Sequence, residues 1–154
     1  MIKSYIKQIA SLNCRGADFY NFLLDYGVDY SPEPNENKKI EDEYHIRPKP
    51  KECFYNAQQL TIFSKGKFGY CEGYAITKAL GGFPLEHAWN IKDGKIVDIT
   101  WNDGIEYFGI ELPYKWIKEK FYEFAFKHKI TDSHLIRYWE EEHQNGEGIH
   151  KNNK

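Results

Sequence analysis

Three residues in the middle of the sequence have side chains that together could perform nucleophilic chemistry: Cys53, His87 and Asp98. A thiol becomes a strong nucleophile when a neighbouring base takes its proton, and imidazole is well suited to that task. A carboxylate on the far side of the imidazole fixes its tautomer and stabilises the imidazolium. If the fold brings the three side chains together, the expected chemistry is acyl transfer through a covalent thioester.

His87 and Asp98 are predicted to lie on the two strands of one hairpin. Asp93-Gly94 separates two apolar runs, one containing His87 and the other Asp98. Both turn residues tolerate the positive φ that a tight primed turn needs. With a two-residue turn, His87 and Asp98 become diagonal neighbours on one face, whereas a three-residue loop with a bulge at Gly94 would part them.

The same hairpin makes a prediction for two tryptophans. With the two-residue turn, Lys92 pairs with Lys95, and counting back puts Trp89 opposite Asp98. Opposed residues share a face, so Trp89 is expected to line or roof the site. Trp101 is expected to point to the other side of the hairpin as an ordinary core residue.

Cys53 is predicted to begin a helix. Cys53, Ala57 and Leu60 form an apolar stripe at helical spacing, Pro50 lies just upstream, and a Ser-Lys-Gly segment follows Phe63. The unpaired N–H groups and the positive dipole at a helix start favour the thiolate form of a cysteine. The backbone N–H of Cys53 is also a natural donor to an oxyanion.

Cys71 is the competing nucleophile, because of the motif Gly69-x-Cys71-x-x-x-Ala75 around it. It lies in a predicted strand from Lys67 to Ile76, where it would lack the help of a helix start, and only 16 residues separate it from His87. We therefore expect Cys53 to be the nucleophile. Cys14 is expected to be an incidental thiol. An odd number of cysteines without CxxC spacing predicts neither a disulfide framework nor a structural zinc site, and we expect no metal or cofactor.

Composition limits the wider function. At 154 residues and 41% hydrophobic content the chain can bury one core, so we expect a single domain over residues 1–140. The formal charge of -2 without a long basic block argues against general nucleic-acid binding. The absence of a long apolar run or a signal-peptide pattern predicts no membrane association and a cytoplasmic location.

The remaining elements are predicted from periodicity and turn residues. We expect two short helices, or one broken helix, before residue 27, a short strand from Ile105 to Glu111, a helix after Pro113, and a last helix that opens at Thr131 or Asp132. Residues 31–51 are expected to form a long loop with a short strand near residues 44–46, either a lid over a site or a solvated loop. Residues 141–154 have almost no apolar content and are expected to be a disordered tail.

The residues Cys53, His87 and Asp98, in this order and with the motifs around them, resemble a known family. The chain resembles the transglutaminase-like branch of the papain-like cysteine superfamily, in which a nucleophilic Cys begins a helix packed on a sheet whose strands bring His and then Asp. His87 follows Cys53 by 34 residues and Asp98 follows His87 by 11. The sequence is also similar to small uncharacterised proteins of phages and bacteria. The likeness rests on five motifs within residues 52–111. They are Cys53-Phe54-x-Asn56-Ala57, Glu72-Gly73-Tyr74-Ala75, His87-Ala88-Trp89, Asp98-x-Thr100-Trp101 and Tyr107-Phe108-Gly109.

The resemblance implies an α+β fold with a papain-like or transglutaminase-like core, and a cysteine hydrolase or acyltransferase with the triad Cys53, His87 and Asp98. The expected partner is a protein, peptide or small acyl substrate. Trp89 and Glu72 are the candidate substrate-binding residues, although Glu72 fits a cross-strand ion pair or hydrogen bond equally well. Papain-type enzymes take a second oxyanion donor from a side chain ahead of the Cys, and Lys51 and Glu52 do not match it. The alternative is a non-catalytic binding protein on the same scaffold that grips a host protein.

Overall fold

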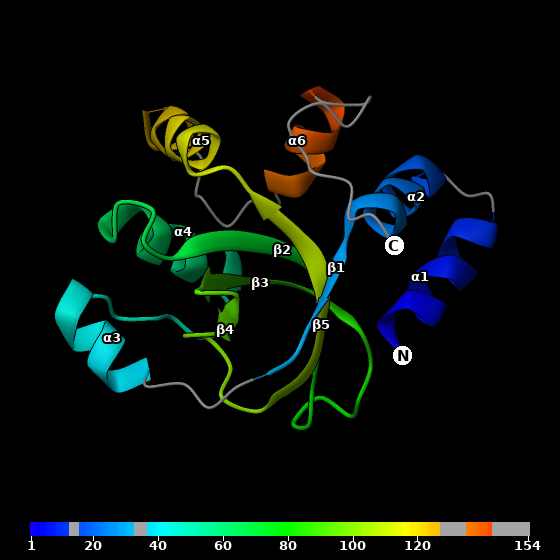
Figure 1. Ribbon diagram of the computed structural model, residues 1–154, viewed down its shortest axis with the longest axis horizontal. Helices are drawn as coiled ribbons and strands as arrows, with labels where there is room; N and C mark the ends of the chain where they lie inside the picture. The colour runs from blue at the N-terminus through cyan, green and yellow to red at the C-terminus, as the bar shows by residue number, and fades with distance from the viewer. Residues whose placement is uncertain (13–15, 33–36, 127–134, 143–154) are drawn as a thin grey trace.

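The computed structural model describes residues 1–12, 16–32, 37–126 and 135–142. Helices and strands alternate irregularly along the chain (Figure 1). In order they are α1 (Ile2–Ser11), α2 (Ala17–Tyr26), β1 (Val28–Tyr30), α3 (Asn37–Tyr44), α4 (Cys53–Phe63), β2 (Gly69–Thr77), β3 (Leu85–Lys92), β4 (Lys95–Val97), β5 (Gly104–Leu112), α5 (Tyr114–Phe126) and α6 (Leu135–Glu142). In the described part of the chain, no helix is both long and apolar enough to cross a bilayer.

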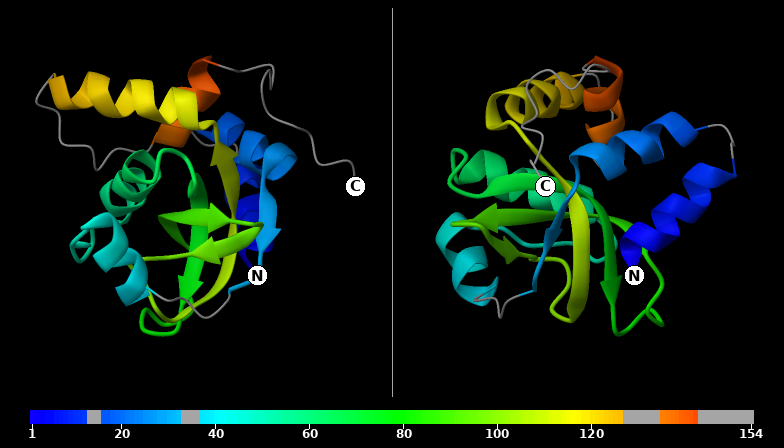
Figure 2. Two further views of the ribbon diagram at one scale, coloured as in Figure 1. Left: turned by 60° about the vertical axis from the view of Figure 1, so that its left-hand side comes forward. Right: turned by 45° about the vertical axis from the view of Figure 1, so that its right-hand side comes forward.

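The five strands form one sheet in the order β1-β5-β2-β3-β4, and every neighbouring pair is antiparallel. The sheet is strongly curled, and the helices flank it as groups (Figures 1 and 2). The pair α1 and α2 lies on one flank, α3 and α4 lie on the opposite flank, and α5 and α6 lie across the end between them. The predicted α+β class is confirmed at this level.

Two apolar clusters account for most of the core. The larger one joins one face of β2 and β5 to residues from α1, α2, α4, α5 and α6, including Leu23, Ala57, Phe108 and Ile117. The smaller one covers the other face and contains Cys71, Ala75, Trp89, Ile91, Ile96 and Tyr107. The central strands are therefore buried on both faces, which explains why β2 contains almost no exposed position.

The predicted hairpin turn is confirmed. Asp93 and Gly94 have φ angles of 53° and 75°, as a two-residue primed turn requires, and Lys92 pairs with Lys95. The pairing of β3 with β4 ends after Asn90 and Val97. Asp98 has already left the strand, so the register counted beyond Val97 does not hold for Asp98 or for the residues that follow it.

The predicted nucleophile helix is also confirmed, and α4 begins at Cys53 itself. The buried side chain of Asn90 ties this helix to the sheet, because its Nδ2 donates to the carbonyl of Ala57 at 2.9 Å and to Oγ1 of Thr61 at 3.0 Å. The same Nδ2 lies 3.2 Å from the carbonyl of Gly69 in β2. These contacts of one buried Nδ2 group fix the helix on the sheet in one place.

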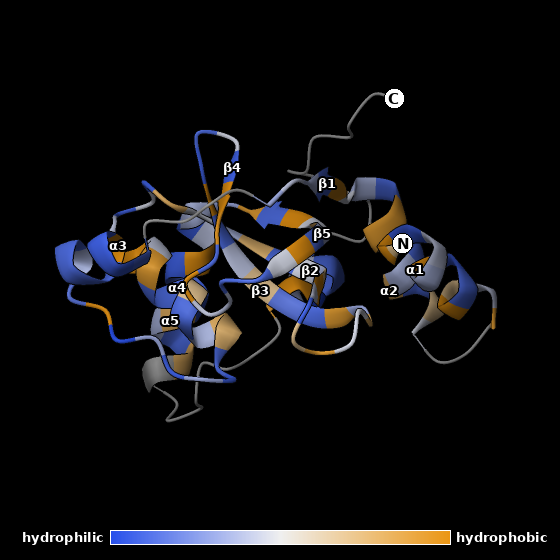
Figure 3. Ribbon diagram, turned by 90° about the horizontal axis from the view of Figure 1, so that it is seen from below, coloured by the Kyte–Doolittle hydropathy of each residue, from blue (hydrophilic) through white to orange (hydrophobic). Residues whose placement is uncertain are grey.

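The expected strand near residues 44–46 is wrong, because residues 37–44 form the helix α3. Ile40 and Tyr44 are spaced one helical turn apart and pack against a small apolar cluster formed by Ile46, Leu60, Phe68, Val97 and Ile99. The rest of α3 is hydrophilic, as its colour in Figure 3 shows, which hid the helical pattern in the sequence. The strand β1 was not predicted either.

The end of the last helix differs by two residues from the predicted domain boundary. Glu141 and Glu142 belong to α6, and Glu142 accepts a hydrogen bond from Nε1 of Trp116 at 2.7 Å. Lys120 also pairs with Glu142. These polar contacts hold the end of α6, which has no apolar side chain. Composition alone therefore placed the predicted domain boundary two residues too early. Thr131, Asp132 and residues 143–154 lie outside the described residues.

A pair of glycines lets the sheet accept the large indole of Trp89. Gly73 and Gly109 face each other on β2 and β5, and a Cβ built on Gly109 would lie 2.2 Å from the carbonyl oxygen of Glu72 and 2.6 Å from the ring of Trp89. Because neither neighbour can move freely, we expect Gly109→Ala to lower the free energy of unfolding by about 3 kcal/mol or more.

Gly82→Ala is the matched control. Gly82 has positive φ but nothing within 4 Å of its built Cβ, so this change should cost only the backbone strain of about 1–2 kcal/mol. Urea denaturation of both variants measures the difference. An equal cost for the two would contradict the close packing at Gly109.

Candidate functional site

His87 and Asp98 form a direct buried pair. Nε2 of His87 lies 2.7 Å from Oδ2 of Asp98, and the two side chains are 0% and 1% exposed. Nε2–H donates a hydrogen bond to the carboxylate, which leaves Nδ1 on the opposite side of the ring. The prediction that the hairpin brings these two residues together is correct, although they meet directly and not as diagonal strand neighbours.

Asp98 uses its two oxygens for different tasks. Oδ1 accepts the backbone N–H groups of Thr100 and Trp101, both at 2.9 Å, and so closes a side-chain turn that reverses the chain after β4. Oδ2 holds His87 and also accepts the hydroxyl of Tyr107 at 2.9 Å. Burial first, and then the charge and hydrogen bond of Asp98, raise the pKa of Tyr107 above its usual range, so Tyr107 remains a neutral donor.

The turn at Asp98 brings Trp101 over the imidazole. The rings of Trp101 and His87 stack with centroids 3.6 Å apart and planes 7° from parallel. The expectation that Trp101 points away into the core is therefore wrong, because the Asp98 side chain bends the backbone before Trp101 is reached. An indole face in this position shields the His87–Asp98 pair and favours the imidazolium.

Cys53 is the second residue, after Asp98, whose charge and hydrogen bond affect His87. Burial alone would lower the pKa of His87, but the charge and hydrogen bond of Asp98, together with those of Cys53, outweigh burial and raise the pKa from 6.5 to about 9. Nδ1 of His87 has no partner of ordinary hydrogen-bond geometry among the described residues. The contact with the thiol is thus looser than a normal hydrogen bond, as catalytic contacts often are before substrate binds.

Access to this group of residues is through the thiol. Cys53 is 9% exposed, whereas His87 and Asp98 are sealed beneath Trp101 and the sheet. The N-cap residue of α4, Glu52, makes no side-chain capping bond, so the positive end of the helix points at the position of the thiol without a competing cap. A developing negative charge on a bound acyl group would therefore lie in a favourable field.

Cys71 has the surroundings of an inert thiol. It is fully buried among Ala75, Trp89 and Tyr107, and its sulfur lies 3.8 Å from the hydroxyl of Tyr30. Burial first, and then the charge of Glu111, raise the pKa of Cys71 well above its usual range. These surroundings favour Cys53 over Cys71 as the nucleophile. Cys14 lies outside the described residues.

Trp89 does not have the surroundings of a substrate-binding residue. It shares a strand face with His87, as predicted, but it is 1% exposed and packs against Tyr30 and Tyr107 with ring centroids 5.9 and 5.2 Å away. Its ring is 6.3 Å from that of His87. The reason is Gly109 on β5, which has no side chain and so leaves room for the indole in the core.

Glu72 is likewise a structural residue and does not face a substrate cleft. It is fully buried, and Oε1 accepts the hydroxyl of Tyr70 at 2.5 Å and the N–H of Leu135 at 2.6 Å. Oε2 accepts the N–H of Ile136 at 3.1 Å. Because these are the first two N–H groups of α6, the carboxylate anchors that helix to the sheet at its positive end.

Sequence reasoning missed four residues that surround the triad. Tyr107, Trp101 and Thr100 contact His87 or Asp98 directly, and Asn56 is joined to them through its bond with Thr100. All four residues belong to the sequence motifs described above, but their amino-acid types alone did not predict these contacts. Asn37, the first residue of α3, also reaches the site, since its Nδ2 donates to the carbonyl of Asp98 at 2.8 Å. The segment over residues 31–51, expected to be either a lid or a solvated loop, therefore contacts the Asp98 turn.

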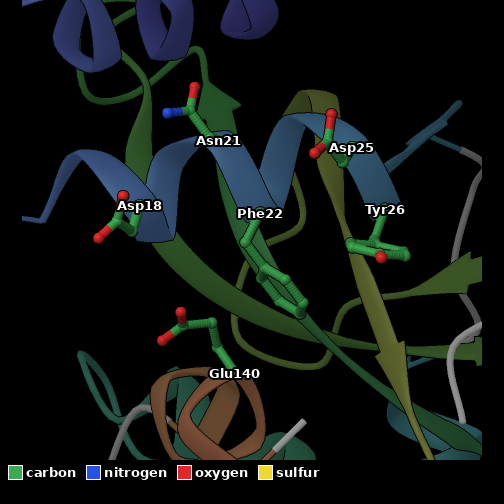
Figure 4. A pocket seen from close by; sticks show the side chains of 6 residues that line it. All are labelled: Asp18, Asn21, Phe22, Asp25, Tyr26 and Glu140. Atoms are coloured by element: carbon green, nitrogen blue, oxygen red, sulfur yellow. The ribbon is translucent and has the colours of Figure 1, made fainter. Parts of the chain in front are cut away.

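A second concavity lies far from this site, between α2 and α6 (Figure 4). It is rich in acidic side chains, and its lining residues are Asp18, Asn21, Phe22, Asp25, Tyr26 and Glu140. In the described part of the chain, no group of three or more His, Cys, Asp and Glu side chains is arranged to hold a metal ion. The recess has no nucleophile or histidine, so the chemistry remains with the Cys53 site.

Comparison of this chain with protein-family models, with curated proteins and with solved structures finds no match.

Proposed function

We propose that the protein is a cysteine-dependent acyl-transfer enzyme that uses Cys53, His87 and Asp98 as a triad. The observation that carries the proposal is the buried pair in which Nε2 of His87 lies 2.7 Å from Oδ2 of Asp98, together with the position of Cys53 at the start of α4. A nucleophile at a helix start, an oriented base and a buried carboxylate are the three parts that such a reaction needs. The order of these parts also fits a papain-like or transglutaminase-like core.

The reaction would proceed in two steps. The Cys53 thiolate attacks the acyl carbonyl, the backbone N–H of Cys53 stabilises the oxyanion, and the His87 imidazolium protonates the leaving amine or thiol as its bond to carbon breaks. This forms a thioester on Cys53. Water or an amine, deprotonated by His87, then attacks the thioester and releases the acid or the new amide with a free thiol. Asp98 keeps Nε2 protonated throughout, so that Nδ1 faces the reacting atoms.

The substrate class is an amide, isopeptide or thioester, presented by a protein, a peptide or a small acyl compound. Both hydrolysis and transfer to an amine follow from the same intermediate, and the acceptor decides between them. Peptidase-like and transglutaminase-like activities are therefore two outcomes of one proposed mechanism.

The low exposure of the site supports the second candidate, a binding protein on the same scaffold with a host protein as its partner. His87 is fully buried and Cys53 is 9% exposed, so little of the triad is available to a large substrate. In that case the Cys53 thiol would resist modification in the folded protein. Reactivity of the individual cysteines separates the two candidates.

The test is alkylation of the native protein with iodoacetamide from pH 5.5 to pH 9, with modified cysteines mapped by mass spectrometry. We expect Cys53 to react before Cys71, because Cys53 lies at the start of α4, whereas burial holds the pKa of Cys71 well above its usual range. An activated ester should then acylate Cys53, and Cys53→Ser should abolish this acylation, whereas Cys71→Ser should leave the acylation of Cys53 intact. Equal or faster modification of Cys71 would overturn the assignment.

A further inference from the structure

Asn56 connects the nucleophile helix to the segment that leads into it. It lies one turn after Cys53 in α4 and is fully buried. Its Oδ1 accepts the N–H of Lys49 at 2.9 Å, and its Nδ2 donates to the carbonyl of Lys49 at 2.8 Å. The side-chain amide thus pairs with the backbone of Lys49 as a neighbouring strand would, and it holds the chain just before the helix start.

The same amide reaches the other half of the triad. Nδ2 of Asn56 lies 3.0 Å from Oγ1 of Thr100, and the N–H of Thr100 donates to Oδ1 of Asp98 at 2.9 Å. A continuous chain of contacts therefore runs from α4 through Asn56 and Thr100 to the carboxylate that holds His87. The segments before Cys53 and after Asp98 are irregular, so neither has a helix or strand ladder of its own to fix it at this point.

We propose that Asn56 and Thr100 are positioning residues that set the separation between the Cys53 thiol and the His87–Asp98 pair. This inference rests on the proposed function of the triad. Asn90 fixes the middle of α4 on the sheet, whereas the bond between Asn56 and Thr100 joins the first turn of that helix to the Asp98 turn. A shift of about 1 Å between reacting groups can cost about a hundredfold in rate, so one well-placed bond suffices to matter.

The test compares two Thr→Val changes that remove the same kind of bond. Thr100→Val removes the acceptor for Nδ2 of Asn56, and the control Thr61→Val removes the acceptor for Nδ2 of Asn90, also at 3.0 Å and also on α4. The readout is the pH profile of Cys53 alkylation by iodoacetamide in the folded protein. We expect Thr100→Val to lower the rate at pH 7 by about tenfold or more, and Thr61→Val and Thr100→Ser to stay within about twofold of the wild type.

The outcomes distinguish this inference from the proposed function. If wild-type Cys53 reacts selectively but Thr100→Val matches Thr61→Val, the positioning role is overturned and the proposed function stands. If wild-type Cys53 reacts no faster than Cys71, the proposed function and this inference both fail. Should Thr100→Val not fold, Thr100→Ala removes the same hydroxyl without adding a methyl group next to the buried amide, and the same outcomes apply.

Discussion

Asp98→Asn should lower the rate of Cys53 acylation by about 10²- to 10⁴-fold while the protein stays folded. The amide has the shape of the carboxylate, and its oxygen can still accept the N–H groups of Thr100 and Trp101. It cannot provide the charge that raises the pKa of His87. Burial then dominates, and the imidazole becomes neutral at pH 7.

The measurement is the acylation rate with an activated ester, together with circular dichroism to verify the fold. Tyr107→Phe is the matched control, because it removes a different hydrogen bond to the same Oδ2 and keeps the charge. We expect a much smaller loss from Tyr107→Phe. A rate for Asp98→Asn close to that of the wild type would mean that Asp98 only shapes the turn after β4.

The two tryptophans near the site should respond in opposite ways to truncation. Trp89→Ala removes a fully buried indole from the smaller apolar cluster and should lower the free energy of unfolding by about 3–5 kcal/mol. Trp101→Ala removes the half-buried ring that stacks on His87 and should cost less stability. It should instead slow the acylation of Cys53 by about tenfold, because the imidazole loses its orientation and its shield from water.

Urea denaturation and ester acylation of the same two variants provide the comparison. Trp101→Phe is the control for stacking, because it keeps an aromatic face over His87 and should recover most of the rate. The roles assigned to the two rings would be incorrect if Trp101→Ala were acylated at the wild-type rate. They would also be incorrect if Trp89→Ala had the same free energy of unfolding as the wild type.

The hairpin could be predicted because its turn chemistry is local. Asp93 and Gly94 determine the turn and therefore the pairing of Lys92 with Lys95. The side-chain turn made by Asp98 could not be predicted in the same way, because it depends on a carboxylate that also binds His87 and Tyr107 across the sheet. For this reason the strand face predicted for Trp89 was correct, whereas the position predicted for Trp101 was wrong.

The start of the nucleophile helix was predictable from its apolar stripe and from the proline before it. The helix α3 was not, because its only apolar contacts are made by the partly buried Ile40 and Tyr44, and its other residues are polar. Glu72 shows a further limit. Its type suggested a role in a cleft, but its partners are the N–H groups of Leu135 and Ile136, which are more than 60 residues away. The papain-like or transglutaminase-like likeness stays a prediction.

The central claim is that Asp98 holds His87 in place and that His87 interacts with the Cys53 thiol, and the titration of His87 tests this claim most directly. Histidine labelled with ¹⁵N reports the protonation of each ring by NMR, and His87→Gln identifies the His87 signal. We expect His87 to keep its proton through neutral pH and to titrate with a pKa of about 9, and we expect Cys53→Ser to lower that pKa. A His87 pKa at or below 6.5 that does not change in Cys53→Ser would contradict the triad.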